Sequence, residues 1–324
     1  MQKRILSGMR PTGSLHIGHL SVIQNWVSLQ KEYESYFTIV DWHALTTGYE
    51  DKLDFKKLIR EIALDWLSVG IDPDKSTVFV QSHVKEHAEL HLLFSMFTPL
   101  SWLERVPTYK DQIQQLGQSG KDLSTYGFLG YPLLQAADIL VYKANAVPVG
   151  EDQLPHIELC REVARRFNYL FEPVFPEPKG LVGKVPLLPG VDGRKMSKSY
   201  NNAISLTASQ EEIKSRVQQM ITDPGRVRKD DPGNPEVCIV HKFHEIYTAE
   251  VADVQENCRG GKIGCVACKK HLAENLDKLL SPFRERRAYW EEPGRVEGVL
   301  KEGAERARET ASETMKGVRE AMGL

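Results

Sequence analysis

The sequence predicts an α/β protein with a parallel sheet covered by helices on both faces, followed by a helical C-terminal region. Residues 4–8, 36–40 and 77–81 are short, nearly all-apolar runs of the kind that forms buried strands. Segments with apolar residues at helical spacing separate these runs, and this alternation is typical of doubly wound sheets. We therefore expect a Rossmann-like fold, in which ligands bind at the carboxyl ends of the strands.

The N-terminal part is expected to run from strand to turn to helix. Residues 4–8 form the strand, Pro11 and Gly13 belong to a turn, and residues 16–31 have apolar side chains near helical spacing. The strand at 36–40 follows. This order puts a glycine-containing loop at the end of the first strand.

The next elements continue the alternation. Residues 54–69 are amphipathic, and Gly70 can end that helix in a left-handed conformation. Beyond the third strand, residues 107–127 are polar and contain glycine, which predicts a surface loop. A helix is expected to begin at Tyr131, with Pro132 in its first turn, where a missing N–H does no harm.

A change of pattern near residue 200 predicts two domains. Residues 146–149 form a further strand, which ends at 150–153 and leads into a helix that reaches about residue 167. From residue 201 onward the pattern is mostly helical and polar. We expect a catalytic domain at 1–200 and a helical domain at 201–324, with the boundary within about ten residues of residue 200.

The composition is that of a soluble globular protein. Of the 324 residues, 41% are hydrophobic and 27% are charged, and the formal net charge is -2. No run approaches the roughly 20 apolar residues of a membrane span. The first four residues lead straight into a strand, without a secretory apolar region. These observations predict a cytoplasmic protein with no membrane partner.

Two histidines at the start of the first helix are candidate phosphate ligands. His16 and His19 lie three residues apart and share one helix face, and Gly18 between them allows close backbone approach. Their N–H groups can donate to phosphate oxygens, aided by the positive end of the helix dipole. The alternative is a pair of surface or capping histidines. Arg10, just upstream, favours the phosphate site.

A second candidate motif, Lys195-Met196-Ser197-Lys198-Ser199, stands far along the chain. It follows Pro189, Gly190 and Gly193, and these residues favour a mobile loop. The ammonium groups of Lys195 and Lys198 would act as point charges on a leaving pyrophosphate. A solvated basic loop is the alternative. Paired with the histidines, the lysine loop predicts ATP-dependent formation of an adenylate.

With these motifs the chain resembles the class I aminoacyl-tRNA synthetases, specifically the tryptophanyl-tRNA synthetase family. The resemblance rests on residues 7–19, 41–47, 131–138, 150–153 and 195–199, in that order. It implies attack of the tryptophan carboxylate on the ATP α-phosphate, with Mg²⁺ on the phosphates, and then transfer to the 3' end of tRNA(Trp). It also implies a homodimer in the cytoplasm.

The amino acid pocket is expected on the helix that begins near residue 131. Tyr131, Gln135 and Asp138 fall at i, i+4 and i+7 and line one face of this helix. The resemblance implies that Asp138 accepts the indole N–H, that Tyr131 and Gln153 hold the ammonium group, and that His43 lines the pocket. The alternatives are that Asp138 caps a helix or forms a salt bridge in the core, and that His43 is structural.

The nucleotide site is expected around residues 150–153, where a strand turns into a helix. Carboxylates there can accept ribose hydroxyls, and the resemblance assigns this contact to Asp152. Glu151 can instead be only a charge at a helix N-terminus. The resemblance assigns adenine recognition to the backbone of Val185. The full set of expected ATP contacts is Arg10, Pro11, Thr12, Gly18, His19, Gly150, Glu151, Asp152, Val185, Lys195, Met196, Ser197, Lys198 and Ser199.

Four cysteines near the C-terminus have the spacing of a chelating site. Cys238, Cys258, Cys265 and Cys268 form C-x19-C-x6-C-x2-C, and disulfides are not expected in the cytoplasm. A subset of bacterial members of the resembled family has a similar arrangement that binds a 4Fe-4S cluster, which implies such a cluster here. A Zn²⁺ site is the competing reading, and uncoordinated thiols are a third. Cys160 stands apart and is expected to be structural.

Two other functions compete with tryptophan activation. A tyrosyl-tRNA synthetase shares both signature motifs, but residues 41–47 (Asp-Trp-His-Ala-Leu-Thr-Thr) argue against it. A catalytically silent, synthetase-like RNA-binding protein is the non-enzymatic alternative. Such proteins usually lose the signature residues, which are all present in this sequence.

Overall fold

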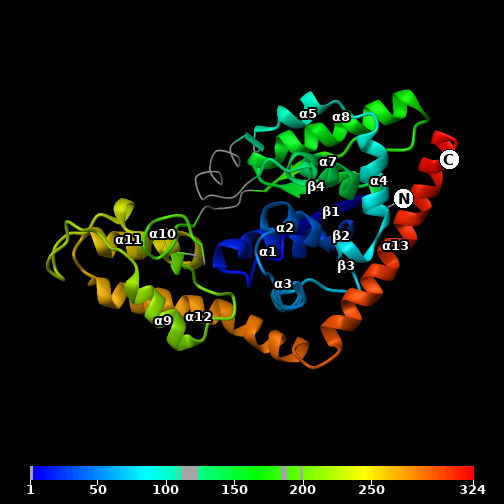
Figure 1. Cartoon of the computed structure of the whole chain (residues 1–324). Coiled ribbons are helices and arrows are strands. Elements are labelled where there is room, and N and C mark those ends of the chain that lie inside the picture. Colours follow the sequence, from blue (N-terminus) through cyan, green and yellow to red (C-terminus); the bar gives the residue numbers. More distant parts are fainter. Residues whose placement is uncertain (1–2, 108, 111–122, 184–187, 198–199) are drawn as a thin grey trace. The chain divides into compact units, whose positions relative to one another are not determined.

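The central element of the fold is a five-stranded parallel sheet. The computed structural model describes residues 3–107, 109–110, 123–183, 188–197 and 200–324. The strands are β1 (Arg4–Met9), β2 (Glu34–Ile39), β3 (Ser76–Val80), β4 (Ala146–Val149) and β5 (Lys179–Val182), in the spatial order β3-β2-β1-β4-β5. All four strand pairs are parallel. The predicted doubly wound α/β fold is confirmed (Figure 1).

Four of the strands lie where the sequence predicts them, and the fifth was missed. Along β1 to β4 most residues are buried, because helices cover the sheet, and this burial is what selects apolar runs. Strand β5 is an edge strand with the sequence Lys-Gly-Leu-Val, and no residue in it is fully buried. Its composition therefore lacks the apolar signal of the other four.

Helices follow most of the strands and predominate among the elements from residue 210 onward. They are α1 (Leu20–Leu29), α2 (Asp41–Gly48), α3 (Phe55–Val69), α4 (Glu86–Ser95), α5 (Leu100–Glu104), α7 (Tyr126–Val141), α8 (Leu154–Leu170), α9 (Gln210–Gln219), α10 (Ile239–Tyr247), α11 (Val251–Arg259), α12 (Cys265–Trp290) and α13 (Arg295–Met322). The end of α3 is as predicted: Gly70 has φ 129° and its N–H bonds to the Trp66 carbonyl.

Helix α7 begins earlier than the sequence predicts. Thr125 caps its N-terminus by accepting a hydrogen bond from the Phe128 amide at 3.2 Å. The predicted place of Pro132 in the first turn is therefore wrong, since this residue lies inside the helix. A proline there removes one backbone donor and turns its ring toward the preceding turn. Pro132 and Leu133 are buried, so packing compensates for the lost hydrogen bond.

The described residues pack as two compact units that interleave along the chain. Unit 1 consists of Met1–Gly13, Asn25–Lys184 and Glu291–Leu324, and unit 2 consists of Ser14–Gln24 and Val185–Trp290. The sequence predicted a single boundary near residue 200. In the packing of the backbone, the histidine motif instead groups with the helical region, and the last helix groups with the sheet.

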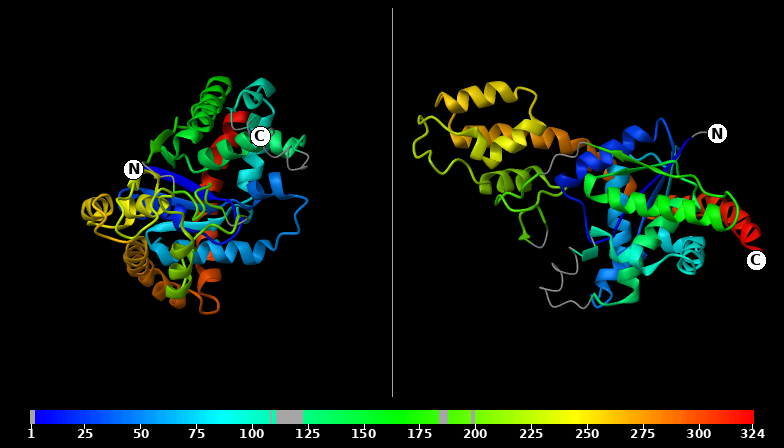
Figure 2. Two further views of the ribbon diagram at one scale, coloured as in Figure 1. Left: turned by 90° about the vertical axis from the view of Figure 1, so that its left-hand side faces the viewer. Right: turned by 90° about the horizontal axis from the view of Figure 1, so that it is seen from above.

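Helix α13 covers the free edge of the sheet in unit 1. It runs beside β3 and α4 (Figures 1 and 2), and Arg306 donates to the Ser76 carbonyl of β3 at 3.2 Å. At Gly303 the helix approaches so closely that a Cβ built there would lie 1.8 Å from the Val78 carbonyl oxygen. Covering an edge strand in this way blocks pairing with another chain. None of the described helices is long and apolar enough to cross a bilayer.

Candidate active site

In unit 2 the two candidate histidines cap the short 3₁₀ helix Ile17–His19. The Gly18 amide donates to His16 Nδ1 at 3.2 Å, and the His16 amide donates to His19 Nδ1 at 3.3 Å. The rings lie 3.9 Å apart, centroid to centroid. Because each Nδ1 accepts a hydrogen bond, each neutral imidazole carries its proton on Nε2. The capping alternative is therefore part of the structure, and it fixes the tautomer that presents Nε2–H as a donor.

The histidine motif lies beside the segment that follows the lysine loop. The Ile17 amide donates to the Ile204 carbonyl at 2.9 Å, and the Leu206 amide donates to the Leu15 carbonyl at 3.2 Å. A Cβ built on Gly18 would lie 3.5 Å from the Met196 sulfur. Two motifs that are about 180 residues apart in sequence therefore meet within one compact unit.

The lysine loop begins with a tight turn that a buried asparagine holds in place. The Gly190 amide donates to the Arg194 carbonyl at 2.7 Å, and Gly193 has φ 80°, which favours glycine. Asn202, 1% exposed, donates to the Lys195 carbonyl and accepts from the Ser197 amide. The sequence does not predict this role of Asn202, since an asparagine three residues after the motif carries no distinct signal.

The side chains of the loop differ in exposure. Lys195 is exposed, whereas Met196 is 7% exposed and belongs to the packed interior. Arg194 pairs with Asp192 and lies 4.8 Å above the Tyr200 ring. Lys198 and Ser199 lie outside the described residues, and so does Val185.

In unit 1 Asp138 is the centre of a buried polar cluster. His43 Nε2 lies 2.9 Å from Asp138 Oδ2, and His87 Nδ1 lies 2.6 Å from Oδ1. Gln81 Nε2 donates to both carboxylate oxygens, at 2.8 and 2.9 Å. Burial raises the pKa of Asp138, but hydrogen bonds from His43 and His87 outweigh it and hold this pKa below its ordinary value. The carboxylate is therefore ionised and fully hydrogen-bonded.

Two residues of this cluster lie just after the carboxyl ends of strands β2 and β3, and the other two lie on helices α4 and α7. His43 is on α2, directly after β2, and Gln81 directly follows β3. Asp138 is on α7 and His87 is in the first turn of α4. The sequence predicted Asp138 and His43 as neighbours, and the structure brings them together. The sequence does not predict Gln81 and His87 as members of the cluster. Gln81 nevertheless stands at the carboxyl end of a predicted strand, where ligands bind in this class of fold.

The other predicted pocket residues lie at the same helix and the neighbouring turn. Tyr131 and Gln135 are half-buried on α7, and the Tyr131 ring lies 5.5 Å from that of His156. Gln153 donates to Asp152 Oδ2 at 2.8 Å. Because its amide nitrogen is turned to a carboxylate, the Gln153 carbonyl oxygen is the end that can accept from an ammonium group.

Most of the remaining predicted nucleotide contacts are at the surface of unit 1. Arg10 and Thr12 are exposed, Pro11 between them is buried, and Arg10 Nη1 lies 3.5 Å from Thr47 Oγ1. Glu151 is exposed, and a Cβ built on Gly150 would lie 2.7 Å from Asp152 Oδ1. These positions are compatible with contact to a dissolved ligand.

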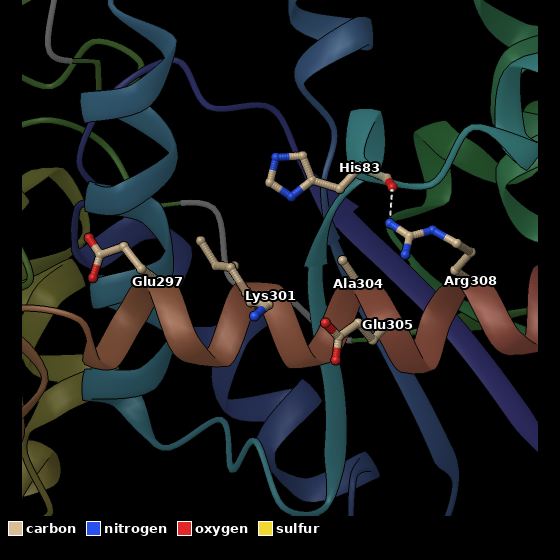
Figure 3. Close-up of a pocket in the computed structure, with 7 residues that line it drawn as sticks. His83, Glu297, Lys301, Ala304, Glu305 and Arg308 are labelled. Atoms are coloured by element: carbon tan, nitrogen blue, oxygen red, sulfur yellow. Dashed lines mark hydrogen bonds between the residues drawn. The ribbon is translucent and has the colours of Figure 1, made fainter.

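A cavity of about 400 Å³ also lies in unit 1. It is lined by His83 and by residues of α13, among them Glu297, Lys301 and Glu305 (Figure 3). Arg308 donates to the His83 carbonyl at 2.9 Å. The lining mixes both charge signs and contains none of the predicted site residues, so it does not identify a substrate.

The four C-terminal cysteines lie near one another in unit 2, with the Arg226 guanidinium among them. Arg226 Nη1 is 3.9 Å from Cys258 Sγ and 4.0 Å from Cys265 Sγ. Burial and the charges of the other three cysteines raise the pKa of Cys268 to about 12. No group of three or more described His, Cys, Asp or Glu residues has the arrangement of a metal site. The metal site therefore stays a prediction. Cys160 is fully buried, as expected for a structural residue.

Comparisons with known proteins agree with the resemblance seen in the sequence. The family model described as class I tRNA synthetases (W and Y) matches residues 2–281. The tryptophan–tRNA ligase of Thermotoga maritima is 55% identical, with 99% of both chains covered. That of Aquifex aeolicus is 46% identical over 99% of this chain and 100% of its own.

A solved structure supports the same assignment. The tryptophanyl-tRNA synthetase of Campylobacter jejuni, crystallised with ADP and tryptophan, superimposes with a TM-score of 0.87 at 34% identity, covering 99% of this chain and 100% of that one. This chain therefore belongs to the class I aminoacyl-tRNA synthetases, in the tryptophanyl-tRNA synthetase family.

Proposed function

We propose that the chain is a tryptophan–tRNA ligase, which activates L-tryptophan with ATP and transfers it to the 3' end of tRNA(Trp). The geometric observation that carries the proposal is the contact between the histidine motif and the segment around Met196 and Ile204. Two loops that both offer phosphate ligands must meet if they are to act on one triphosphate. The tyrosine-specific alternative is disfavoured because the most similar curated relatives considered above are tryptophan–tRNA ligases.

In this proposal the phosphate chemistry belongs to unit 2. A tryptophan carboxylate oxygen attacks the α-phosphorus, the bond to the bridging oxygen breaks, and pyrophosphate leaves. His16 and His19 donate Nε2–H to phosphate oxygens, and Lys195 and Lys198 stabilise the charge that develops on the leaving group. Mg²⁺, when bound to the phosphates, adds further charge neutralisation. Positioning and charge stabilisation suffice, so no protein nucleophile is needed.

Recognition of the amino acid and the ribose belongs to unit 1. Asp138 is the acceptor for the indole N–H, with His43 and Gln135 in the same pocket. Tyr131 and the Gln153 carbonyl hold the ammonium group. A buried acceptor of this kind favours tryptophan over phenylalanine, because only the indole N–H can replace one of the protein donors at Asp138.

The remaining proposed contacts are those to the nucleotide. Asp152 accepts the ribose hydroxyls, and the backbone at Gly150 and Glu151 approaches the nucleotide. The Val185 backbone reads adenine. The other proposed ATP contacts are Arg10, Pro11, Thr12, Gly18, Met196, Ser197 and Ser199.

The test is charging of tRNA with labelled amino acids. Purified protein and tRNA(Trp) should give tryptophan on the 3' end, with tyrosine at least about 100-fold less efficient, as expected for a pocket with a buried acceptor. Equal charging with tyrosine would overturn the assignment of the substrate. Formation of adenylate without any charging would limit the proposal to the first step.

We propose in addition that Cys238, Cys258, Cys265 and Cys268 hold a 4Fe-4S cluster, with Zn²⁺ as the alternative. The donor chemistry fits, since four thiolates can bind either group. Gly233 also fits a crowded centre, because a Cβ built there would lie 2.7 Å from Cys258 Sγ. A positive metal centre would offset the mutual repulsion of the thiolates.

Metal analysis of anaerobically purified protein separates these readings. A cluster predicts about four irons per chain and broad visible absorbance near about 400 nm. Colourless protein with one zinc per chain would favour the alternative, and protein free of both metals would contradict the proposal. The remaining parts of the proposal are a homodimer, which light scattering tests as twice the chain mass, and a cytoplasmic location.

A further inference from the structure

We propose that His87 is a positioning residue for tryptophan recognition: locked by Tyr142, it holds the Asp138 carboxylate in the orientation that receives the indole N–H. The inference rests on the proposed function and adds a residue to it. His87 does not touch substrate in this account. It acts through Asp138.

Both ring nitrogens of His87 are hydrogen-bonded inside the core. The side chain has no solvent exposure, Nδ1 lies 2.6 Å from Asp138 Oδ1, and Nε2 lies 2.7 Å from the Tyr142 hydroxyl. These are the two shortest hydrogen bonds of the buried cluster. The imidazole therefore bridges a phenol and a carboxylate with no freedom to turn.

The positions of the protons in the hydrogen-bonded series Tyr142–His87–Asp138 follow from the chemistry of Tyr142 and Asp138. Burial raises the pKa of Tyr142 well above its ordinary value, so the phenol keeps its proton and can donate it to His87 Nε2. A neutral imidazole that accepts at Nε2 carries its proton on Nδ1. That Nδ1–H then donates to Asp138, which is ionised. Tyr142 thus selects the tautomer of His87 that Asp138 requires.

Tyr142 is itself held by packing on all sides. Its ring stacks on Tyr36 with a centroid distance of 4.6 Å and meets the edge of Phe79 at 5.5 Å. The Tyr36 hydroxyl bonds to Glu34 at 2.7 Å and to Thr310 at 2.9 Å. The orientation of His87 is therefore set by strands β2 and β3 and by α13, elements far from α7 in sequence.

The carboxylate needs such a support because it is shared among several donors. A carboxylate has about four acceptor positions. His43, Gln81 and His87 together make four contacts to the Asp138 oxygens. An indole N–H can bind to Asp138 only when one of these donors gives up its hydrogen bond. His87 is the donor whose ring is held at both nitrogens, by Asp138 and by Tyr142. His87 therefore keeps the carboxylate in place while another contact is exchanged.

The experiment combines variants of His87 with two substrates. His87→Leu removes both hydrogen bonds, His87→Asn keeps an amide N–H near the place of Nδ1, and Tyr142→Phe removes only the phenol. The substrates are tryptophan and 3-benzothienylalanine, in which sulfur replaces the indole N–H at nearly equal shape. The reaction followed is ATP–pyrophosphate exchange, with KM and kcat for each amino acid. His91→Leu, one turn further along α4, is the matched control.

We expect His87→Leu to raise the KM for tryptophan at least about 10-fold and to leave that for the benzothienyl analogue within about 2-fold, because only tryptophan uses the oriented acceptor. In His87→Asn the KM for tryptophan should return most of the way to the wild-type value, and in Tyr142→Phe it should rise about 3-fold. His91→Leu should keep the substrate preference of the wild type.

The proposal is overturned if His87→Leu and Tyr142→Phe lower activity equally with both substrates, since this pattern would indicate core packing alone. If His87→Leu does not fold, Tyr142→Phe and His87→Asn still test the proposal, because Tyr142→Phe removes only one hydroxyl group and His87→Asn keeps a polar donor in the core. A wild-type protein that gives no exchange with tryptophan would refute the proposed function instead. The two failures are therefore distinguishable.

Discussion

The side-chain amide of Asn202 donates a hydrogen bond to the main-chain oxygen of Lys195 at 3.1 Å. The same amide donates to Asp192 at 2.7 Å, and its oxygen accepts from the Ser197 amide at 2.8 Å. One buried side chain thus fixes the lysine loop at three points. The lysine loop, which the sequence predicts to be mobile, is therefore held by a specific side chain.

Removal of this anchor should slow activation. We expect Asn202→Ala to lower the rate of adenylate formation about 10- to 100-fold, because misplaced charges stabilise the leaving pyrophosphate poorly. The KM for tryptophan should change little, since Asn202 is not in the amino acid pocket. Single-turnover and steady-state kinetics measure both quantities. Asn201→Gly, which removes only the neighbouring contact to Arg216, is the control and should stay near the wild-type rate.

Loss of a loop lysine should act on chemistry rather than on binding. We expect Lys198→Ala to reduce the pyrophosphate exchange rate about 100- to 1000-fold with little effect on the binding of tryptophan, since the ammonium group stabilises charge that exists only in the transition state. Arg194→Ala removes a nearby exposed charge that is paired with Asp192 and serves as control. A Lys198→Ala protein with a normal exchange rate would refute the assigned role.

Acid should destabilise unit 1 through His156. Burial, together with the smaller effect of the nearby His43, lowers the pKa of His156 from an ordinary 6.5 to about 4. The unfolded chain therefore binds the proton more readily, and the free energy of unfolding should fall as the pH drops from 6.5 toward 4, by roughly 2 to 3 kcal/mol. Urea denaturation between pH 7 and pH 4 measures this slope. In His156→Asn the slope should be smaller, and an unchanged slope would show that other groups cause it.

The close approach of α13 to β3 predicts opposite effects of one substitution at two positions. Gly303→Ala should lower the free energy of unfolding by about 1 to 3 kcal/mol, because the added methyl group would collide with the Val78 carbonyl. Gly317→Ala, on the same helix and with no atom near the added Cβ, should be stabilising by about 0.5 to 1 kcal/mol. Thermal unfolding measures both. Equal effects at the two positions would mean that α13 does not pack on β3 as described.

The parts of the fold that the sequence predicts are those that leave a periodic signal. Most residues of strands β1 to β4 are buried, and each strand contains a short run of apolar residues, while α3 has both an N-cap aspartate and a terminal glycine. Strand β5 carries no such run, because an edge strand is only partly covered. The return of α13 to the sheet depends on a long-range contact at Gly303, and no local pattern encodes such a contact.

The candidate site divides in the same way. Asp138 could be predicted because a polar stripe on an apolar helix requires a partner, and His16 and Lys195 belong to short recognisable motifs. His87 and Tyr142 could not, because a single histidine and a single tyrosine have no spacing that reveals a shared hydrogen bond. Asn202 was missed for the same reason. These supporting residues emerge only when the backbone brings distant segments together.

The central claim is that this chain activates tryptophan, and amino acid-dependent ATP–pyrophosphate exchange tests it most directly. With tryptophan, tyrosine and phenylalanine measured side by side, the structure predicts rapid exchange with tryptophan and, with phenylalanine, a rate lower by a factor on the order of 10² or more, because phenylalanine has no N–H to donate to Asp138. Exchange that is fastest with tyrosine, or absent with all three amino acids, would contradict this account.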